Sequence, residues 1–178
     1  MNLPNALTAL RIFLVPWLVV LLLTRTEWGW FLGLVVFTIA VLTDYFDGWF
    51  ARRRNEQTKL GAILDPLADK LLVSAAFISL IELEMAPAWI VAVIIGREFA
   101  VTWLRSEALS RGVVIAASGA GKAKTVSQIV AIYVMLLALR LPIFLNLVAL
   151  SLFVALALTL YSGVDYFRRF ARGTTSRP

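Results

Sequence analysis

Long apolar stretches alternate with short polar breaks along this chain. Six stretches can be drawn, with approximate bounds 6–24, 28–50, 61–82, 86–108, 123–140 and 143–166. Each holds about 18–25 residues, the length that an α-helix needs to cross a bilayer. The first is interrupted by Arg11, and its opening MNLPNALTALRIF is interpreted as an interfacial amphipathic turn that leads into the span. The pattern predicts an all-α integral membrane protein of six transmembrane helices, with a short N-terminal interfacial segment, in a single domain over residues 1–178.

The basic residues gather at alternate breaks and therefore indicate an orientation. One side holds three basic groups, which are Arg52, Arg53, Arg54 and Lys59, then Arg105, Arg111, Lys122 and Lys124, then Arg168, Arg169, Arg172 and Arg177. The other side holds little beyond Arg25 and Arg140. Because short cytoplasmic loops carry an excess of Lys and Arg, we expect both termini and the loop near residues 51–59 to face the cytoplasm.

The composition narrows the chemistry that this chain can perform. The 178 residues are 61% hydrophobic and include neither cysteine nor histidine. Disulfides, thiolate chemistry and the commonest general base are therefore excluded, so catalysis must use carboxylates, Lys, Arg, hydroxyls or a bound metal. In a membrane protein, the net charge of +6 favours anionic headgroups or phosphorylated substrates over nucleic acid.

Four aspartates stand out against this apolar background: Asp44, Asp47, Asp65 and Asp69. The first two are spaced i, i+3 near the end of one stretch, and the last two i, i+4 near the start of the next. On helices, each pair lies on one face. A short connection makes the helices antiparallel neighbours, so the four carboxylates can converge. Two unit charges about 4 Å apart repel by about 4 kcal/mol at an effective dielectric near 20, and we expect Mg²⁺ or Mn²⁺ to compensate them in an all-oxygen site.

Small and basic residues share these helical stripes. Gly48, Ala51 and Gly61 would let a nucleotide press against helix backbone, and glycine inside a helix costs about 1 kcal/mol, so its place there needs a reason. Arg52 can bind a phosphate with two nitrogens, and Thr58 can hydrogen-bond to one. The alternative is structural, because acidic residues at span ends are commonly solvated and small residues in spans commonly pack helices.

The stretch from Asp44 to Asp69 reads D-x-x-D-G-x-x-A-R-x8-G-x3-D-x3-D without a departure. It resembles the signature of the CDP-alcohol phosphotransferases, integral membrane enzymes of phospholipid synthesis with a six-span fold. The resemblance implies a homodimeric, metal-dependent enzyme with a pair of Mg²⁺ or Mn²⁺ ions. The implied metal ligands are Asp44, Asp47, Asp65 and Asp69, and the implied lining of the CDP-diacylglycerol site includes Gly48, Ala51, Arg52 and Thr58. Asp69 would also be the catalytic general base, and in a chain without histidine an aspartate is the plausible candidate nearby.

Three further motifs bear on the acceptor alcohol. The start PNALTALR, the segment IIGREFAVTWLR and the loop AASGAGKAKTVSQ resemble elements of bacterial phosphatidylglycerophosphate synthases, a subgroup of that family. The cations Arg97, Arg111, Lys122 and Lys124 form a set suited to the phosphate of glycerol 3-phosphate. Arg97 falls near the middle of an apolar stretch, where a charge is costly. Its alternative role is a structural pair with Glu98 or another buried carboxylate, and the two lysines alternatively flank a span as cytoplasmic basic residues.

The N-terminal residues Asn5, Thr8 and Arg11 have two interpretations. They would either close the CDP-diacylglycerol site from the first helix, or cap that helix and anchor it at the membrane interface.

Together these features predict an enzyme of the bacterial cytoplasmic membrane, with its active site at the cytoplasmic edge. It would transfer the phosphatidyl group from CDP-diacylglycerol to glycerol 3-phosphate, giving phosphatidylglycerophosphate and CMP. The alternative acceptors are phosphatidylglycerol, as in cardiolipin synthase, and inositol 1-phosphate. Alternatives of another class are a catalytically silent subunit and a divalent-cation transporter, which would need carboxylates near the bilayer midplane and an acidic path to both faces.

Overall fold

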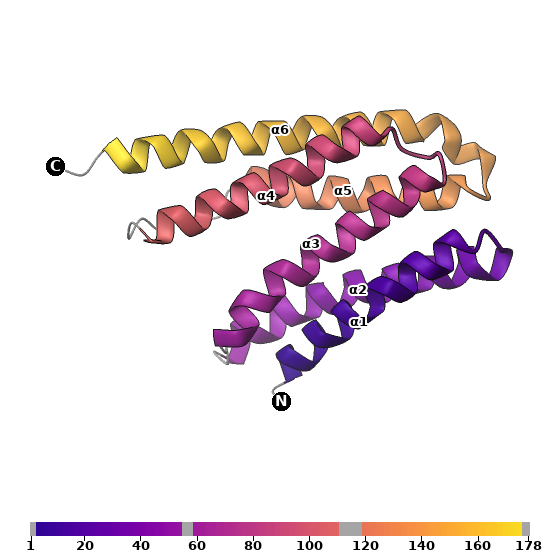
Figure 1. Ribbon diagram of the computed structural model, residues 1–178, viewed down its shortest axis with the longest axis horizontal. Helices are drawn as coiled ribbons and strands as arrows, with labels where there is room; N and C mark the ends of the chain where they lie inside the picture. Colours follow the sequence, from indigo (N-terminus) through magenta and orange to yellow (C-terminus); the bar gives the residue numbers. More distant parts are fainter. Residues whose placement is uncertain (1–2, 55–58, 111–118, 176–178) are drawn as a thin grey trace. The chain divides into compact units, whose positions relative to one another are not determined.

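The computed structural model describes the backbone of residues 3–54, 59–110 and 119–175, and the side chains of residues 8–44, 67–110 and 119–171. Over these residues the chain is all-α, with six α-helices and one short 3₁₀ turn (Figure 1). The elements are α1 Leu3–Leu23, α2 Glu27–Arg54, α3 Lys59–Glu82, α4 Ala88–Ser110, α5 Gly119–Ala138, η1 Pro142–Phe144 and α6 Leu145–Thr175. They form two compact units, residues 1–84 and 85–178.

In the first unit, α1 packs against both α2 and α3. Leu18 of α1, Phe37 of α2 and Phe77 of α3 are fully buried in its core. Gly29 allows the close approach of α1 and α2, because a Cβ at this position would lie 2.5 Å from the backbone oxygen of Leu21. The apolar stretches of the sequence therefore fold into a three-helix layer with a continuous core.

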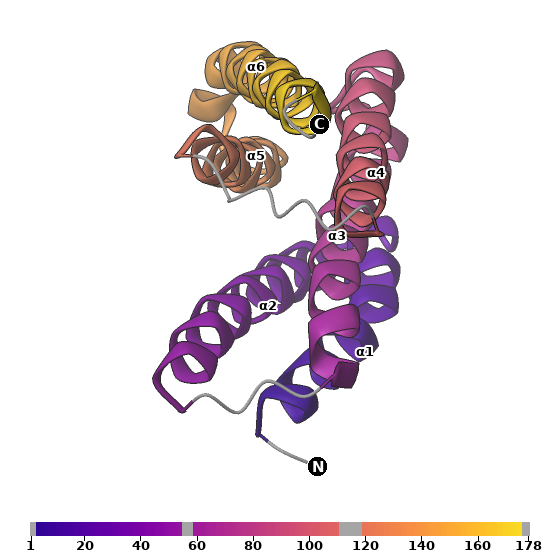
Figure 2. The same ribbon diagram turned by 90° about the vertical axis from the view of Figure 1, so that its left-hand side faces the viewer.

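In the second unit, α6 packs against both α4 and α5. The two views of the molecule show α5 and α6 running side by side (Figures 1 and 2). Ile94, Ile132, Met135 and Ala155 are fully buried between these helices. The turn from α5 to α6 contains Pro142 at the start of η1, a position where a missing N–H breaks no helical hydrogen bond.

Large apolar side chains cover the outside of both units. Phe13, Trp28, Trp103, Ile143 and Phe153 are each more than half exposed. A large exposed apolar surface marks a face that meets lipid or a partner rather than water. The outer faces of these helices are therefore typical of a membrane protein.

Three segments of the described chain are long and apolar enough to cross a membrane: Glu27–Asp44, Gly119–Ala138 and Pro142–Ala171. Among the residues whose side chains are described, the apolar part of α1 is Thr8–Leu23, which is shorter than these three segments. Helix α4 has the length of a span, with 23 residues, but it carries Arg97 and Glu98 near its middle. The predicted helices are thus all present, whereas six spans, one membrane domain and cytoplasmic termini remain predictions.

The N-terminal stretch predicted as an interfacial turn leading into the first span belongs, from Leu3 on, to one continuous helix, and its place at a membrane interface remains a prediction. Helix α1 begins at Leu3 and runs through Arg11 to Leu23 without a break. The last helix also continues to Thr175, beyond the end of the last apolar stretch. Its extra turns are stabilised by an i, i+4 ion pair in which Arg169 Nε lies 3.1 Å from Asp165 Oδ2.

Candidate active site

Arg11 joins the three helices of the first unit at one point. Its Nη1 lies 3.2 Å from Asp44 Oδ1 on α2 and 2.7 Å from Asp69 Oδ1 on α3. The Arg11 side chain is 1% exposed, whereas both carboxylates are 45% exposed. A guanidinium buried among apolar helices needs such partners, because an unpaired charge there is very unfavourable. Through Arg11, the first and last aspartates of the 44–69 segment lie at most about 6 Å apart, oxygen to oxygen.

Helical spacing explains why these side chains meet. Phe37, Ala40 and Asp44 are spaced i, i+3 and i+7 on α2, so the carboxylate continues the buried stripe of that helix. Asp69 begins the corresponding stripe on α3, which continues with the buried Leu72. Packing of the apolar parts of these stripes therefore brings the two carboxylates to the same end of the core.

Within the described trio of Arg11, Asp44 and Asp69, the formal charges are only partly balanced. Two carboxylates about 6 Å apart repel by about 3 kcal/mol at an effective dielectric near 20. Arg11 offsets this repulsion, yet Arg11, Asp44 and Asp69 together still carry one net negative charge. The chain itself thus supplies part of the compensation for which the sequence suggests a metal.

The two described carboxylates fit the predicted metal site. They are half exposed, so they are accessible to an ion, and carboxylate oxygens are the ligands that Mg²⁺ and Mn²⁺ prefer. Among the side chains that the structure describes, no third acidic group joins them. The side chains of Asp47 and Asp65 lie outside that part of the chain, so the four-aspartate site remains a prediction.

The other residues predicted for the CDP-diacylglycerol site are placed mainly by their backbone. Helix α2 includes Gly48, Ala51 and Arg52, α3 includes Gly61, and α1 includes Asn5, all with side chains outside the described residues. Thr58 lies outside the described backbone as well.

Thr8 lies one turn before Arg11 on the same face of α1, and both side chains are buried. The ion pairs with Asp44 and Asp69 place Arg11 at the carboxylates, whereas the roles predicted for Asn5 and Thr8 remain predictions.

A second polar cluster lies inside the other unit, between α4, α5 and α6. Glu98 Oε1 lies 2.5 Å from Lys124 Nζ and 3.2 Å from Arg97 Nη1. It also accepts a hydrogen bond of 3.5 Å from Gln128 Nε2. The side chains of Arg97, Glu98 and Lys124 are 12%, 14% and 9% exposed. We call these four residues the Glu98 cluster.

Helix α6 holds the Glu98 cluster from a third side. Arg97 Nη2 donates to Ser162 Oγ at 2.8 Å, and Gln128 Nε2 donates to Thr159 Oγ1 at 3.0 Å. Gly163 leaves room for the arginine, since a Cβ there would lie 3.2 Å from Arg97 Nε. The cluster is therefore bonded to all three helices of its unit.

The four cations predicted to bind the acceptor phosphate have different surroundings. Arg97 and Lys124 meet at Glu98, and Lys124 is too deeply buried to be a solvated flanking residue. Lys122 is exposed near the start of α5, and Arg111 lies outside the described residues. The structure contains the ion pair between Arg97 and Glu98 that was the alternative to phosphate binding. This pair is compatible with both roles of Arg97.

Comparisons with known proteins identify the family of the chain. The model of the CDP-alcohol phosphatidyltransferase family matches residues 1–161. The chain belongs to this family. A Bacillus subtilis (strain 168) protein is 44% identical, with 94% of each chain covered. A protein of Salmonella choleraesuis (strain SC-B67) is 38% identical, with 97% of this chain and 96% of that protein covered. A protein of Escherichia coli (strain K12) is 37% identical, with 93% of this chain and 92% of that protein covered. All three are named CDP-diacylglycerol–glycerol-3-phosphate 3-phosphatidyltransferase.

Membership of the CDP-alcohol phosphatidyltransferase family confirms the resemblance read from the Asp44–Asp69 segment. It also confirms that the chain is a transferase, an enzyme rather than a silent subunit or an ion transporter. In this family member, Arg11 connects the two ends of the signature segment.

From the sequence, Glu98 had only an alternative role, as a structural partner of Arg97, Gln128 had no role, and the role of Arg11 was left open. Glu98 stands in the quoted segment IIGREFAVTWLR and Gln128 in the quoted segment AASGAGKAKTVSQ. The available signal was the polarity of the motifs, because a carboxylate near the middle of an apolar helix needs cationic partners. For Arg11 the signal was a charge inside the first apolar stretch, three residues after Thr8.

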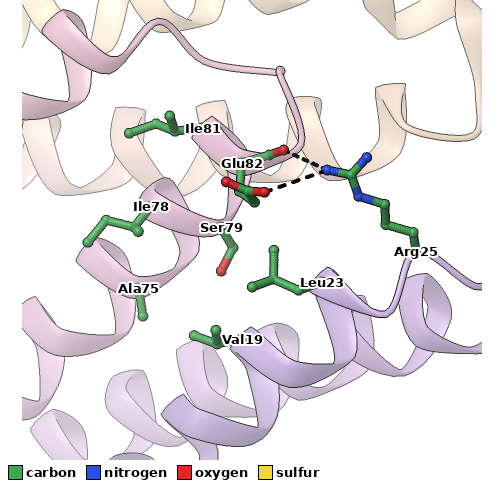
Figure 3. Close-up of a pocket in the computed structure, with 8 residues that line it drawn as sticks. All are labelled: Val19, Leu23, Arg25, Ala75, Ile78, Ser79, Ile81 and Glu82. Atoms are coloured by element: carbon green, nitrogen blue, oxygen red, sulfur yellow. Dashed lines mark hydrogen bonds and ion pairs between the residues drawn. The ribbon is translucent and has the colours of Figure 1, made fainter.

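A cavity of about 520 Å³ lies elsewhere in the first unit (Figure 3). Its lining consists of Val19, Leu23, Arg25, Ala75, Ile78, Ser79, Ile81 and Glu82. Arg25 has a left-handed backbone, φ 54°, and its Nη2 donates to the backbone oxygen of Glu82 at 2.9 Å. The lining of the cavity on α3 runs from Ala75 to Glu82 and begins six residues, about 9 Å along the helix, after Asp69. Neither Asp44 nor Asp69 lines the cavity.

Proposed function

We propose that this chain transfers the phosphatidyl group of CDP-diacylglycerol to glycerol 3-phosphate, giving phosphatidylglycerophosphate and CMP. The names of relatives that match over more than nine-tenths of the chain support this activity. The main structural support is that Asp44 and Asp69 both contact Arg11. These contacts bring the two ends of the signature segment together.

The donor would bind at the aspartates of the first unit. Asp44, Asp47, Asp65 and Asp69 would hold a pair of Mg²⁺ or Mn²⁺ ions, which would supply positive charge beside the pyrophosphate. Gly48, Ala51, Gly61, Thr58, Arg52, Asn5 and Thr8 would form the surrounding CDP-diacylglycerol site. Arg11 would keep Asp44 and Asp69 close together by reducing their mutual repulsion.

The reaction would be a single displacement at phosphorus. Asp69 takes the proton from the C1 hydroxyl of glycerol 3-phosphate, and the hydroxyl oxygen forms a bond to the β-phosphorus of CDP-diacylglycerol. The bond from that phosphorus to the bridging oxygen breaks, and CMP leaves with this oxygen, with Arg52 near its phosphate. No covalent intermediate is required, so catalysis consists mainly of positioning and charge neutralisation.

The acceptor phosphate would be bound by the cations that the sequence predicts, Arg97, Arg111, Lys122 and Lys124. Arg97, Lys124 and Glu98 together carry one net positive charge at 9–14% exposure, which favours an anionic ligand. A neutral alcohol would leave that charge unmatched. We also propose a homodimer in the bacterial cytoplasmic membrane with the active site at the cytoplasmic edge.

An assay of the purified protein with a panel of alcohols tests this function. CMP release from CDP-diacylglycerol is measured with glycerol 3-phosphate, phosphatidylglycerol or inositol 1-phosphate, each with Mg²⁺, with Mn²⁺ and with a chelator. We expect release with glycerol 3-phosphate that the chelator abolishes, and none from Asp69→Asn. Release with only another alcohol would overturn the acceptor, and release that survives the chelator would overturn the metal dependence.

A further inference from the structure

Glu98 is the centre of a part-buried hydrogen-bond network that spans three helices. Lys124 Nζ at 2.5 Å, Arg97 Nη1 at 3.2 Å and Gln128 Nε2 at 3.5 Å all converge on one oxygen, Oε1. One donor is adjacent in the sequence, and the other two come from α5, 26 and 30 residues further along the chain. Glu98 thus fixes the positions of two cations that belong to different helices.

The charge of this network differs from that of a purely structural ion pair. A structural pair balances one cation with one carboxylate, whereas Glu98 faces both Arg97 and Lys124. Two cations that share one carboxylate would repel each other at low exposure if that carboxylate were removed. Arg97, Lys124 and Glu98 together carry one net positive charge, so the network is suited to receive an anion.

The hydrogen bonds of Arg97 support the same interpretation. Its Nη1 binds Glu98 and its Nη2 binds Ser162, so the guanidinium is held at two nitrogens. Its Nε is buried and has no hydrogen-bond partner among the described residues. A buried donor without a partner costs about 1–3 kcal/mol, which a bound ligand oxygen would recover.

We infer that Glu98 is a positioning residue of the acceptor site, which holds Arg97 and Lys124 in place for the acceptor phosphate without itself contacting the acceptor. This inference rests on the proposed function, because it takes the acceptor to be a phosphorylated alcohol. Glu98 also keeps the two cations together when the acceptor is absent, so the site is formed before the acceptor binds.

The test is a double-mutant cycle on Glu98→Gln and Lys124→Met, with steady-state kinetics for both substrates. We expect each single variant to raise the KM for glycerol 3-phosphate about tenfold, which corresponds to about 1.4 kcal/mol. The KM for CDP-diacylglycerol should stay within about twofold. Because Glu98 acts through Lys124, the KM for glycerol 3-phosphate of the double variant should rise by much less than the product of the two single-variant increases. Glu107→Gln, a carboxylate change on the same helix, is the matched control and should leave both KM values unchanged.

Three results would overturn the inference. The first is an unchanged or lower KM for glycerol 3-phosphate in Glu98→Gln. The second is an equal rise in both KM values together with a loss of thermal stability, which is the signature of a structural role. The third is a double variant in which the increase in KM for glycerol 3-phosphate equals the product of the two single-variant increases. If Glu98→Gln does not fold, Glu98→Asp replaces it, because this variant keeps the charge but shortens the side chain by one methylene. An unchanged KM for glycerol 3-phosphate in Glu98→Asp would also overturn the inference. Failure of the proposed function is distinguishable, because the wild-type protein would then form no product from glycerol 3-phosphate.

Discussion

Replacement of Arg11 by methionine should reveal how the carboxylates are held. The substitution keeps an unbranched apolar side chain in α1 and removes the cation between Asp44 and Asp69. Loss of one partner of a fully buried ion pair costs about 3–5 kcal/mol. Here the two carboxylates are 45% exposed and are partly solvated, so we expect a smaller loss, about 2–3 kcal/mol. The repulsion of about 3 kcal/mol between two carboxylates about 6 Å apart agrees with this range.

Thermal unfolding of the purified protein in detergent measures this loss. For a chain of this size, 1 kcal/mol corresponds to about 2–4 °C, so Arg11→Met should lower the Tm by about 5–10 °C in the presence of a chelator. Addition of Mn²⁺ should raise the Tm of the variant more than that of the wild type, because the ion replaces the missing positive charge. Arg25→Met is the matched control, since Arg25 is 63% exposed and its pair with Glu82 should contribute less than about 1 kcal/mol.

Two outcomes would refute this reasoning about Arg11. If Arg11→Met and Arg25→Met had equal Tm values in chelator, Arg11 would not be stabilising the carboxylates. If Mn²⁺ stabilised the wild type and Arg11→Met equally, the ion and the guanidinium would not compensate the same charges.

Three further substitutions test other parts of the account. Asp69→Asn should lower kcat at least a hundredfold, because it removes the general base, and a kcat within tenfold of the wild type would contradict this role. The accompanying change in Tm should be small, because the substitution removes the attraction of Asp69 to Arg11 and its repulsion from Asp44 together. Gly163→Ala should raise the KM for glycerol 3-phosphate several-fold, since its methyl would crowd Arg97. Gly96→Ala is the control and should leave this KM unchanged, because a Cβ at Gly96 has no neighbour within 4 Å. Equal kinetics for the two variants would argue against the position of Arg97. Phe37→Ala should destabilise the protein by about 3–5 kcal/mol through the cavity it leaves, measured by thermal unfolding, and a loss under 1 kcal/mol would contradict its place in the core.

The helices could be predicted from the sequence because each one contains a long, mainly apolar run. The bounds α3 Lys59–Glu82 and α4 Ala88–Ser110 lie within about two residues of the apolar stretches 61–82 and 86–108. The end of α6 was not predictable in this way, because its last turns are polar and depend on local pairs such as Arg169 with Asp165.

The partners of the charged residues could not be predicted from spacing alone. Arg11 lies 58 residues from Asp69, so their contact depends on how α1 packs against α3. Glu98 was visible as a possible partner of Arg97, its neighbour, but its contact with Lys124 depends on the packing of α4 and α5 on α6. The signature singles out four aspartates whose roles remain predictions, whereas tertiary packing determines that Arg11 accompanies Asp44 and Asp69.

The proposed activity is the transfer of a phosphatidyl group to glycerol 3-phosphate at the signature aspartates. Its most direct test is a competition in which the purified protein receives CDP-diacylglycerol, Mn²⁺ and equal amounts of glycerol 3-phosphate and phosphatidylglycerol, with the lipid products identified by mass spectrometry. We predict phosphatidylglycerophosphate as the dominant product, formed in step with CMP and absent with Asp69→Asn. Cardiolipin as the dominant product, or product formation that persists in Asp69→Asn, would contradict the claim.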